Sequence, residues 1–295
     1  MDTLRTNIER ALHGDKPLLA GFGLEFGAVS APLWDETLTI DGNGHAALTT
    51  LRSAAEMGGE PVGDFRAQLA EADVLQLLQK IARTNFHALV PTRAGLHDMR
   101  LSISMVIGGV PYAWQLAGSE PQSRAAAQEL VAELGRLTSL VRQHPMATVD
   151  AQLQLGRVGR GEITLDARVV LRNAGAEGLW LPSPPALRYD EEDAPHEGLF
   201  LRYGKQMPFG PNEEPLPMTY LTTPIDVRAV GDESALRWLA GGASDTVEGT
   251  APCATGPGTY RFHVLYSTYA HPGTVAGRRR FRGCAISPDV VVEIP

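Results

Sequence analysis

The side chains that could perform chemistry in this sequence are its histidines, its two cysteines and a few turn carboxylates. The eight histidines are scattered, without the i, i+4 or short-loop spacing that places two imidazoles on one metal ion. Cys253 and Cys284 fit no zinc-type spacing and are too few for a disulfide framework. Cys284 would serve as a nucleophile beside a histidine, but its apolar neighbours favour a core residue. The sequence therefore predicts no metal and no cofactor.

Two glycine-containing segments invite a ligand-binding interpretation. Residues 41–45, Asp-Gly-Asn-Gly-His, begin like a calcium loop, but Ala46 and Arg52 stand where the loop needs a glycine and a closing glutamate. We interpret this segment as a hairpin turn. Residues 21–27 carry three glycines, but the third is displaced by one position and no strand–turn–helix pattern follows, so we exclude a dinucleotide loop. Phosphate-loop, nucleophile-elbow and His-Glu-x-x-His motifs are absent from the sequence.

The charged residues indicate the kind of partner. The chain has 26 basic and 34 acidic residues and a net charge of −8, which disfavours nucleic-acid binding. An acidic run occupies 190–193, and a basic cluster follows near the end of the chain. Arginines on a strand guard a sheet edge against aggregation or bind carboxylates in a bidentate manner. The guard role is the leading interpretation of such a cluster. If the cluster binds a partner instead, the acidic balance of the chain favours a protein over a nucleic acid. The cluster consists of Arg278, Arg279, Arg280 and Arg282.

The first half of the chain alternates between helical and strand-like patterns. Apolar residues recur at i, i+3, i+4 and i+7 in 71–84, which predicts a helix with one buried stripe. Apolar and polar residues alternate around the turns at 41–44 and 108–109, which predicts two hairpins. Further helices are predicted over 3–13 and 122–143, and strand-like ranges are 19–29, 34–40, 45–50, 99–107 and 110–116. We predict an α+β domain over 1–147, with antiparallel hairpins packed against helices.

The order hairpin, helix, hairpin, helix over 34–143 resembles a widespread family of small, uncharacterised bacterial α+β domains. The residues that carry the resemblance are 37–44, Thr-Leu-Thr-Ile-Asp-Gly-Asn-Gly. In that family a similar hairpin precedes a helix that opens on an acidic signal, here at 69–73, where the family's serine cap and proline are missing. The resemblance implies the layout of the elements and transfers no catalytic residue.

The second half has the pattern of an all-β domain. Alternating strands are predicted near 163–172, 179–181, 259–266 and 290–294. The Gly-x-Tyr-x-Phe-x-Val strand at 258–264 resembles the penultimate strand of immunoglobulin-like β-sandwiches, and this resemblance implies a corner tyrosine at Tyr260 and a core tryptophan at Trp180. His263 alternates outward on this strand, so we expect it to face solvent. We predict an immunoglobulin-like sandwich over 148–295.

Proline marks the expected contact surface. Eleven of the 21 prolines lie in 182–257, which predicts long loops and edge strands there. We expect these loops and the arginine cluster to bind a partner protein. The candidate contact residues of the loop region are Tyr203, Met207, Phe209 and Tyr220.

These observations favour a non-enzymatic protein-interaction module, such as a bacterial immunity or inhibitor protein or an adaptor of a secretion or defence assembly. One alternative is a hydrolytic enzyme whose site gathers residues distant in sequence, marked by a histidine within hydrogen-bond reach of a carboxylate. Another is carbohydrate binding by an exposed aromatic platform at Trp34, Trp238 or Tyr220. The sequence contains no membrane-spanning apolar stretch. We expect a cytoplasmic protein, with a trimmed signal peptide as the alternative.

Overall fold

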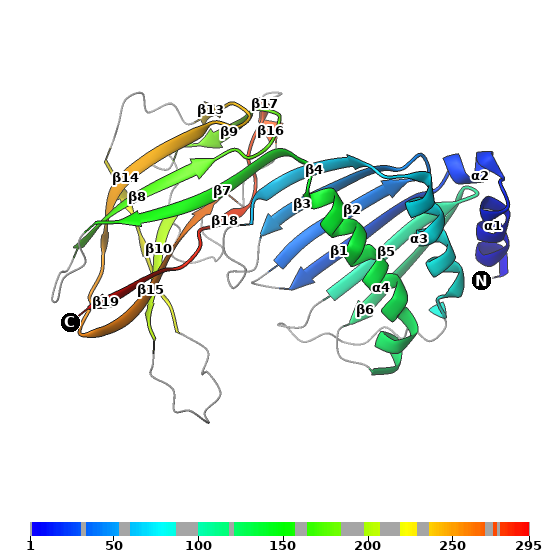
Figure 1. Cartoon of the computed structure of the whole chain (residues 1–295), viewed down its shortest axis with the longest axis horizontal. Coiled ribbons are helices and arrows are strands. Elements are labelled where there is room, and N and C mark those ends of the chain that lie inside the picture. Colours follow the sequence, from blue (N-terminus) through cyan, green and yellow to red (C-terminus); the bar gives the residue numbers. More distant parts are fainter. Residues whose placement is uncertain are drawn as a thin grey trace. The chain divides into compact units, whose positions relative to one another are not determined.

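A computed structural model describes most of the chain (Figure 1). The described residues are 2–30, 34–52, 60–86, 100–117, 121–156, 164–183, 198–206, 219–228, 236–268, 274–275 and 278–294. The chain divides into two compact units. The first comprises Met1–Thr50 and Asp64–Met146, and the second comprises Leu51–Gly63 and Ala147–Pro295.

The first unit is built on an antiparallel sheet. Its central strand β1 (Gly23–Ser30) pairs with β2 (Trp34–Asp41) on one side and with β5 (Arg100–Ile107) on the other. Beyond them lie β6 (Val110–Ala117) next to β5, and β3 (His45–Arg52) followed by β4 (Val62–Gln68) next to β2. Alternate residues face opposite sides, so that Leu24 and Phe26 enter the core while Glu25 faces away from it.

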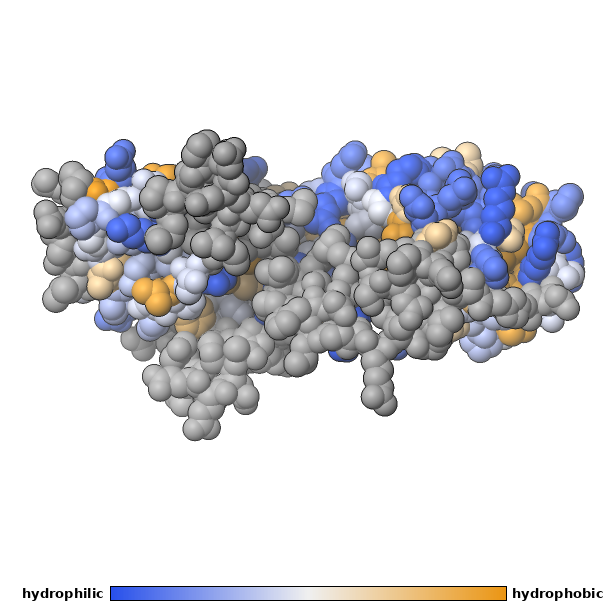
Figure 2. All heavy atoms as spheres, turned by 90° about the horizontal axis from the view of Figure 1, so that it is seen from below, coloured by the Kyte–Doolittle hydropathy of each residue, from blue (hydrophilic) through white to orange (hydrophobic). Residues whose placement is uncertain are grey.

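Helices supply the other half of this core. The first unit contains α1 (Asp2–Leu12), α2 (Lys16–Ala20), α3 (Glu71–Arg83) and α4 (Pro121–Arg142), and α3 and α4 run across the strands (Figure 1). The buried stripe of α3 is Val74, Leu77, Leu78 and Ile81, as its periodicity predicts. Helix α1 is amphipathic as well, and hydrophilic side chains predominate on the surface at its end of the unit (Figure 2). The helices thus cover one face of the sheet.

The second unit is made almost entirely of strands in its described parts. One antiparallel group contains β7 (Pro145–Leu155), β8 (Thr164–Arg172), β14 (Ser244–Pro252) and β12 (Asp226–Val227). The other contains β11 (Leu221–Pro224), β10 (Gly198–Lys205), β15 (Gly258–Ser267), β18 (Cys284–Ile286) and β19 (Val290–Ile294). Two short ribbons pair β9 (Leu179–Pro182) with β13 (Leu236–Leu239), and β16 (Thr274–Val275) with β17 (Arg278–Arg279). Both groups direct side chains into one core around Phe262 and Tyr266.

The predicted fold class, an α+β domain followed by an immunoglobulin-like sandwich, is wrong. Strands make up 55% of the structure and helices 22%, with four helices in the described ranges, so the fold is predominantly β. Hydrogen-bonded pairing joins fifteen strands into one large sheet that is mostly antiparallel. A strand from the first half of the sequence takes part in the second unit, because Arg52 of β3 pairs with Cys284 of β18. Alternation within a segment does not reveal such a distant partner.

Two local expectations in the second unit have different outcomes. The hydroxyl of Tyr260 accepts a hydrogen bond from the Gly256 N–H at 3.0 Å, the backbone contact expected of a corner tyrosine. Trp180 is only half-buried and pairs across the β9–β13 ribbon with Trp238, so it is not a core tryptophan. Both cysteines are buried, and neither forms a disulfide bond. In the described part of the chain, no helix has the length and apolar character needed to cross a membrane.

Candidate binding site

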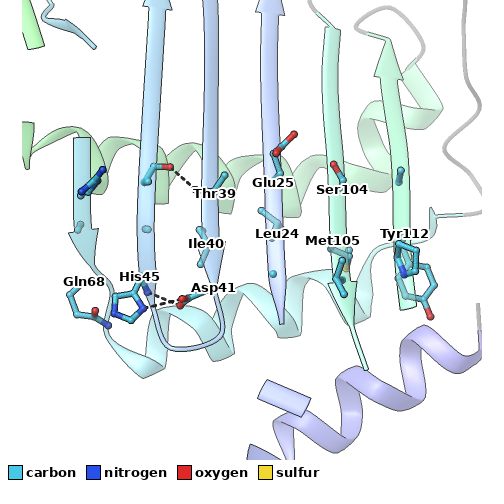
Figure 3. A pocket seen from close by; sticks show the side chains of 18 residues that line it. Leu24, Glu25, Thr39, Ile40, Asp41, His45, Gln68, Ser104, Met105 and Tyr112 are labelled. Atoms are coloured by element: carbon cyan, nitrogen blue, oxygen red, sulfur yellow. Dashed lines mark hydrogen bonds and ion pairs between the residues drawn. The ribbon is translucent and has the colours of Figure 1, made fainter. Parts of the chain in front are cut away.

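A hollow of about 1140 Å³ lies on the first unit's sheet, on the face opposite the helices (Figure 3). It is lined from all six strands, β1 to β6, so the sheet itself forms its floor. In the middle of this floor the outward-facing residues beside Glu25 are small, namely Gly23, Thr39, Ala47, Ser104 and Ala113. Longer side chains, among them those of His45, Arg66 and Gln68, line its β3–β4 side.

Glu25 occupies the middle of this floor. It stands opposite Thr39 on β2 and opposite Ser104 on β5, and Ser104 in turn stands opposite Ala113 on β6. Glu25 is exposed, and no ion pair engages its carboxylate in the described ranges. A carboxylate surrounded by short side chains is accessible to a cationic group that approaches the sheet.

Glycine accounts for the space beside Glu25. A Cβ added at Gly23 would meet no atom within 4 Å, so the floor is open at this position. Gly27, on the other side of Glu25 along β1, differs because its added Cβ would lie 2.6 Å from the Ser102 hydroxyl. Glycine weakens a strand relative to a side chain that packs. Its use at Gly23, where a side chain would fit, keeps the hollow open.

The β2–β3 turn fixes one rim of the hollow. The Asp41 carboxylate accepts hydrogen bonds from the backbone N–H groups of Asn43 and His45, each at 2.9 Å, and lies 2.9 Å from the His45 Nδ1. Partial burial acts to raise the pKa of Asp41, but these hydrogen bonds outweigh it and lower the pKa below its ordinary value. The Gln68 side chain donates to the Asn43 carbonyl at 2.7 Å and ties β4 to the same turn. The predicted hairpin turn at 41–44 is confirmed.

A second polar cluster lies on β15 of the second unit, on the side away from that unit's core. His263 is only 1% exposed, and its Nδ1 lies 3.0 Å from the Asp289 carboxylate. The expectation that His263 faces solvent is wrong, because Tyr220 covers it with a ring-to-ring distance of 4.8 Å. Arg202, the cross-strand neighbour of His263, places its guanidinium 5.1 Å from the Tyr220 ring centre.

Burial governs the chemistry of this histidine. It lowers the pKa of His263 below its ordinary value, and the nearby Arg202 charge acts in the same direction, while the hydrogen bond to Asp289 opposes both. Asp289 therefore accepts from Nδ1–H of a neutral ring, which leaves a lone pair on Nε2. That Nε2 atom is buried and has no hydrogen-bond partner in the described part of the chain.

Each of these two sites contains a histidine within hydrogen-bond reach of a carboxylate, the arrangement that marks the hydrolase alternative. A hydrolase of this kind also needs a nucleophile that the histidine can deprotonate. Across the described ranges, neither His45 nor His263 is hydrogen-bonded to a serine, threonine or cysteine side chain. Cys284 is fully buried, which raises the pKa of its thiol and disfavours the reactive thiolate. The hydrolase alternative stays a prediction.

The predicted arginine cluster lies in the second unit. Arg279 is half-buried and its guanidinium lies 2.6 Å from the Glu177 carboxylate. Arg280 is half-buried and Arg282 is exposed. Arg278 belongs to strand β17, and its side chain lies outside the described residues. The structure thus places Arg279 in an ion pair with a carboxylate of the same chain.

The predicted loop contacts are separated from one another. Tyr203 is buried in the core, where its ring stacks on Phe262 at 5.9 Å. Tyr220 is half-buried over His263. Met207 and Phe209 lie outside the described residues. Their role in binding a partner stays a prediction.

The sequence interpretation missed Glu25, Gly23 and the His263–Asp289 pair. The strand pattern predicted over 19–29 does carry a signal for Glu25, because strand alternation places it opposite the apolar face. His263 and Asp289 are 26 residues apart and carried no such signal.

Comparisons with known proteins add little to this picture. No family model and no curated protein matches the chain. Among solved structures, it is similar to red sea bream transglutaminase with a TM-score of 0.24 and 10% identity, over 94% of this chain and 27% of that one. It is also similar to a β-glucosidase from Paenibacillus barengoltzii, with a TM-score of 0.19 and 17% identity, over 50% of this chain and 15% of that one. A third similar structure is m157 from mouse cytomegalovirus, with a TM-score of 0.14 and 10% identity, over 96% of this chain and 100% of that one. The chain therefore spans about a quarter of the transglutaminase's length, and similarities this low carry no functional argument.

Proposed function

We propose that this protein is a non-enzymatic binding module whose first unit receives a segment of a partner protein on the open face of its sheet. The observation that carries the proposal is the exposed carboxylate of Glu25 at the centre of a floor of small side chains. A basic side chain of the partner pairs with Glu25. Inhibition of a basic toxin or hydrolase, or an adaptor role in a secretion or defence assembly, is the biological setting that fits this chemistry.

A second charge on the same floor gives the partner segment a direction. Arg66 on β4 lines the hollow, is exposed, and has no ion pair in the described ranges. Strands β2 and β3 separate it from β1, so three strand spacings of about 4.8 Å place Arg66 about 14 Å from Glu25. An extended peptide advances about 3.3 Å per residue, so a basic and an acidic residue four positions apart match the two charges.

The size of the hollow favours a polypeptide over a small ligand. Its volume of about 1140 Å³ is at or above the upper end of ordinary small-molecule pockets. It extends over six strands. Such a floor makes contact with several consecutive residues of a segment.

The test uses two acetylated, amidated pentapeptides, Lys-Ala-Ala-Ala-Glu and Ala-Ala-Ala-Ala-Ala, titrated into labelled protein and followed by amide chemical shifts. We expect the charged peptide to shift the amides of Gly23, Glu25 and Ser104, and the alanine peptide to leave them unchanged. Glu25→Gln should weaken the charged peptide's binding at least fivefold. Glu293→Gln, an exposed strand glutamate of the second unit, is the matched control and should bind as the wild type does.

A steric variant separates binding from folding. Gly23→Val places a side chain in open space on a strand position, so the free energy of unfolding should stay equal or rise. The same change should remove the peptide-induced shifts. The proposal is overturned if Glu25→Gln and Gly23→Val both bind the charged peptide as tightly as the wild type, or if the alanine peptide binds equally well.

A further inference from the structure

The second unit presents one large aromatic side chain to solvent beside a separate hollow. Trp238, on strand β13, is 55% exposed. It lines a hollow of about 520 Å³, within the range of ordinary ligand pockets. The other lining residues come from β13, from β14 and from the turn between them, and are Arg237, Leu239, Ala240, Ala243, Ser244, Asp245 and Thr246.

The indole ring is held in place from behind. A Cβ added at Gly178 would lie 2.1 Å from the six-membered ring of Trp238, so the ring rests directly on a glycine backbone. Trp180, the cross-strand partner of Trp238, packs beside it with ring centres 5.3 Å apart and planes inclined by 58°. A fixed aromatic ring binds a ligand at less entropic cost than a mobile one.

The two charged side chains that line this hollow neutralise each other's charge. Arg237 and Asp245 both line the hollow and form an ion pair at 2.9 Å, with about a quarter of each side chain exposed. Both line the hollow together with the hydroxyl-bearing Ser244 and Thr246, and they still offer hydrogen-bond donors and acceptors to a ligand there. The hollow therefore combines an apolar platform with hydrogen-bonding groups of balanced charge.

We propose that this hollow binds a neutral carbohydrate. One face of a pyranose ring is apolar because its C–H groups point the same way, and its rim carries hydroxyl groups that both donate and accept. The apolar face would stack on Trp238, and the hydroxyls would bond to Arg237 and Asp245. An anionic or cationic ligand would compete with the existing ion pair. This inference is independent of the hollow on the first unit.

The experiment titrates full-length protein with four neutral hexasaccharides, of glucose, galactose, mannose and N-acetylglucosamine, and with the acidic hexamer of galacturonate. Binding is followed by isothermal titration calorimetry and by tryptophan fluorescence. We expect at least one neutral hexasaccharide to bind and to change the fluorescence, and the acidic hexamer not to bind. Trp238→Ala should weaken that binding at least tenfold, while Trp238→Tyr should retain part of it.

Two further variants separate a site from a change in folding. Gly178→Ala should displace the indole ring and weaken binding although no contact residue is altered. Val291→Ala removes an equally exposed apolar side chain, 56% exposed, from β19 and should bind normally. The proposal is overturned if no neutral hexasaccharide binds, if only the acidic one binds, or if Trp238→Ala binds as the wild type does.

Discussion

Polar side chains on the outward sheet faces of the two units lie in opposite surroundings, exposed in the first unit and buried in the second. On the first unit's sheet, the face away from the core carries small residues around the exposed Glu25. On the second unit's strand β15, the face away from the core carries the buried His263, held by Asp289 and covered by Tyr220. A charge in water costs little and is available to a partner, whereas a buried polar group must be paired or it destabilises the fold. The first arrangement leaves its charge accessible, and the second makes the stability of the fold depend on the hydrogen bond between His263 and Asp289.

The largest expected change in the free energy of unfolding comes from substituting Asp289. Asp289→Ala leaves the His263 Nδ1–H without an acceptor on a ring whose Nε2 already lacks a partner, and an unsatisfied buried group costs about 1–3 kcal/mol. We expect a loss of that size in the free energy of unfolding, measured by urea denaturation. Asp289→Asn keeps an acceptor oxygen and should recover most of it.

The matched change in the first unit is Glu25→Gln, which alters an exposed side chain and should change stability by less than about 0.5 kcal/mol. If Asp289→Ala were as mild as Glu25→Gln, the contrast between the two faces would be wrong.

The pH dependence of stability sharpens the same contrast. Burial lowers the pKa of His263 below about 6.5, its value in an unfolded chain. Between these two pKa values the unfolded chain binds a proton that the native state does not, so the free energy of unfolding decreases as pH falls below about 6.5. Urea midpoints at pH 8, 7, 6 and 5 should show a smaller decrease for His263→Gln than for the wild type. Equal pH profiles for the two proteins would contradict a buried, neutral His263.

Local elements were predictable where one segment carries its own pattern. The helix predicted over 71–84 is confirmed as α3, and the hairpin around residues 108–109 is confirmed as β5–β6. Strand β4 was missed because its alternation breaks at Gly63, which has φ +136° and whose added Cβ would lie 2.3 Å from the Ala147 carbonyl. Val62 and Phe65 are therefore both fully buried although three positions apart, Val62 in the second unit's core and Phe65 in the first's.

Only part of the candidate site could be predicted from the sequence. Alternation in the strand predicted over 19–29 already separates Glu25 from Leu24 and Phe26. The neighbours that make a floor around Glu25 are Thr39 and Ser104, which come from strands paired on either side. Strand order and register depend on the packing of the whole sheet rather than on any one segment. The fold class was wrong for the same reason.

The last comparison concerns two threonines on strands of the two units. Thr148 of β7 is fully buried, and its hydroxyl has no hydrogen-bond partner in the described part of the chain. Thr49 of β3 is half-buried, and its hydroxyl donates to the Asp64 carboxylate at 2.8 Å. Valine keeps the shape of threonine and removes the hydroxyl, so Thr148→Val should raise the free energy of unfolding by about 1 kcal/mol, because an unsatisfied group is lost.

Thr49→Val removes a satisfied hydrogen bond to a charged group and should lower the free energy of unfolding by about 1 kcal/mol. The two substitutions are chemically identical, so the opposite signs would come only from the surroundings of each hydroxyl. Chemical denaturation of both variants beside the wild type measures the difference. If both substitutions changed the free energy of unfolding in the same direction, the presence or absence of a hydrogen-bond partner would not decide what a threonine hydroxyl contributes to stability in these sheets.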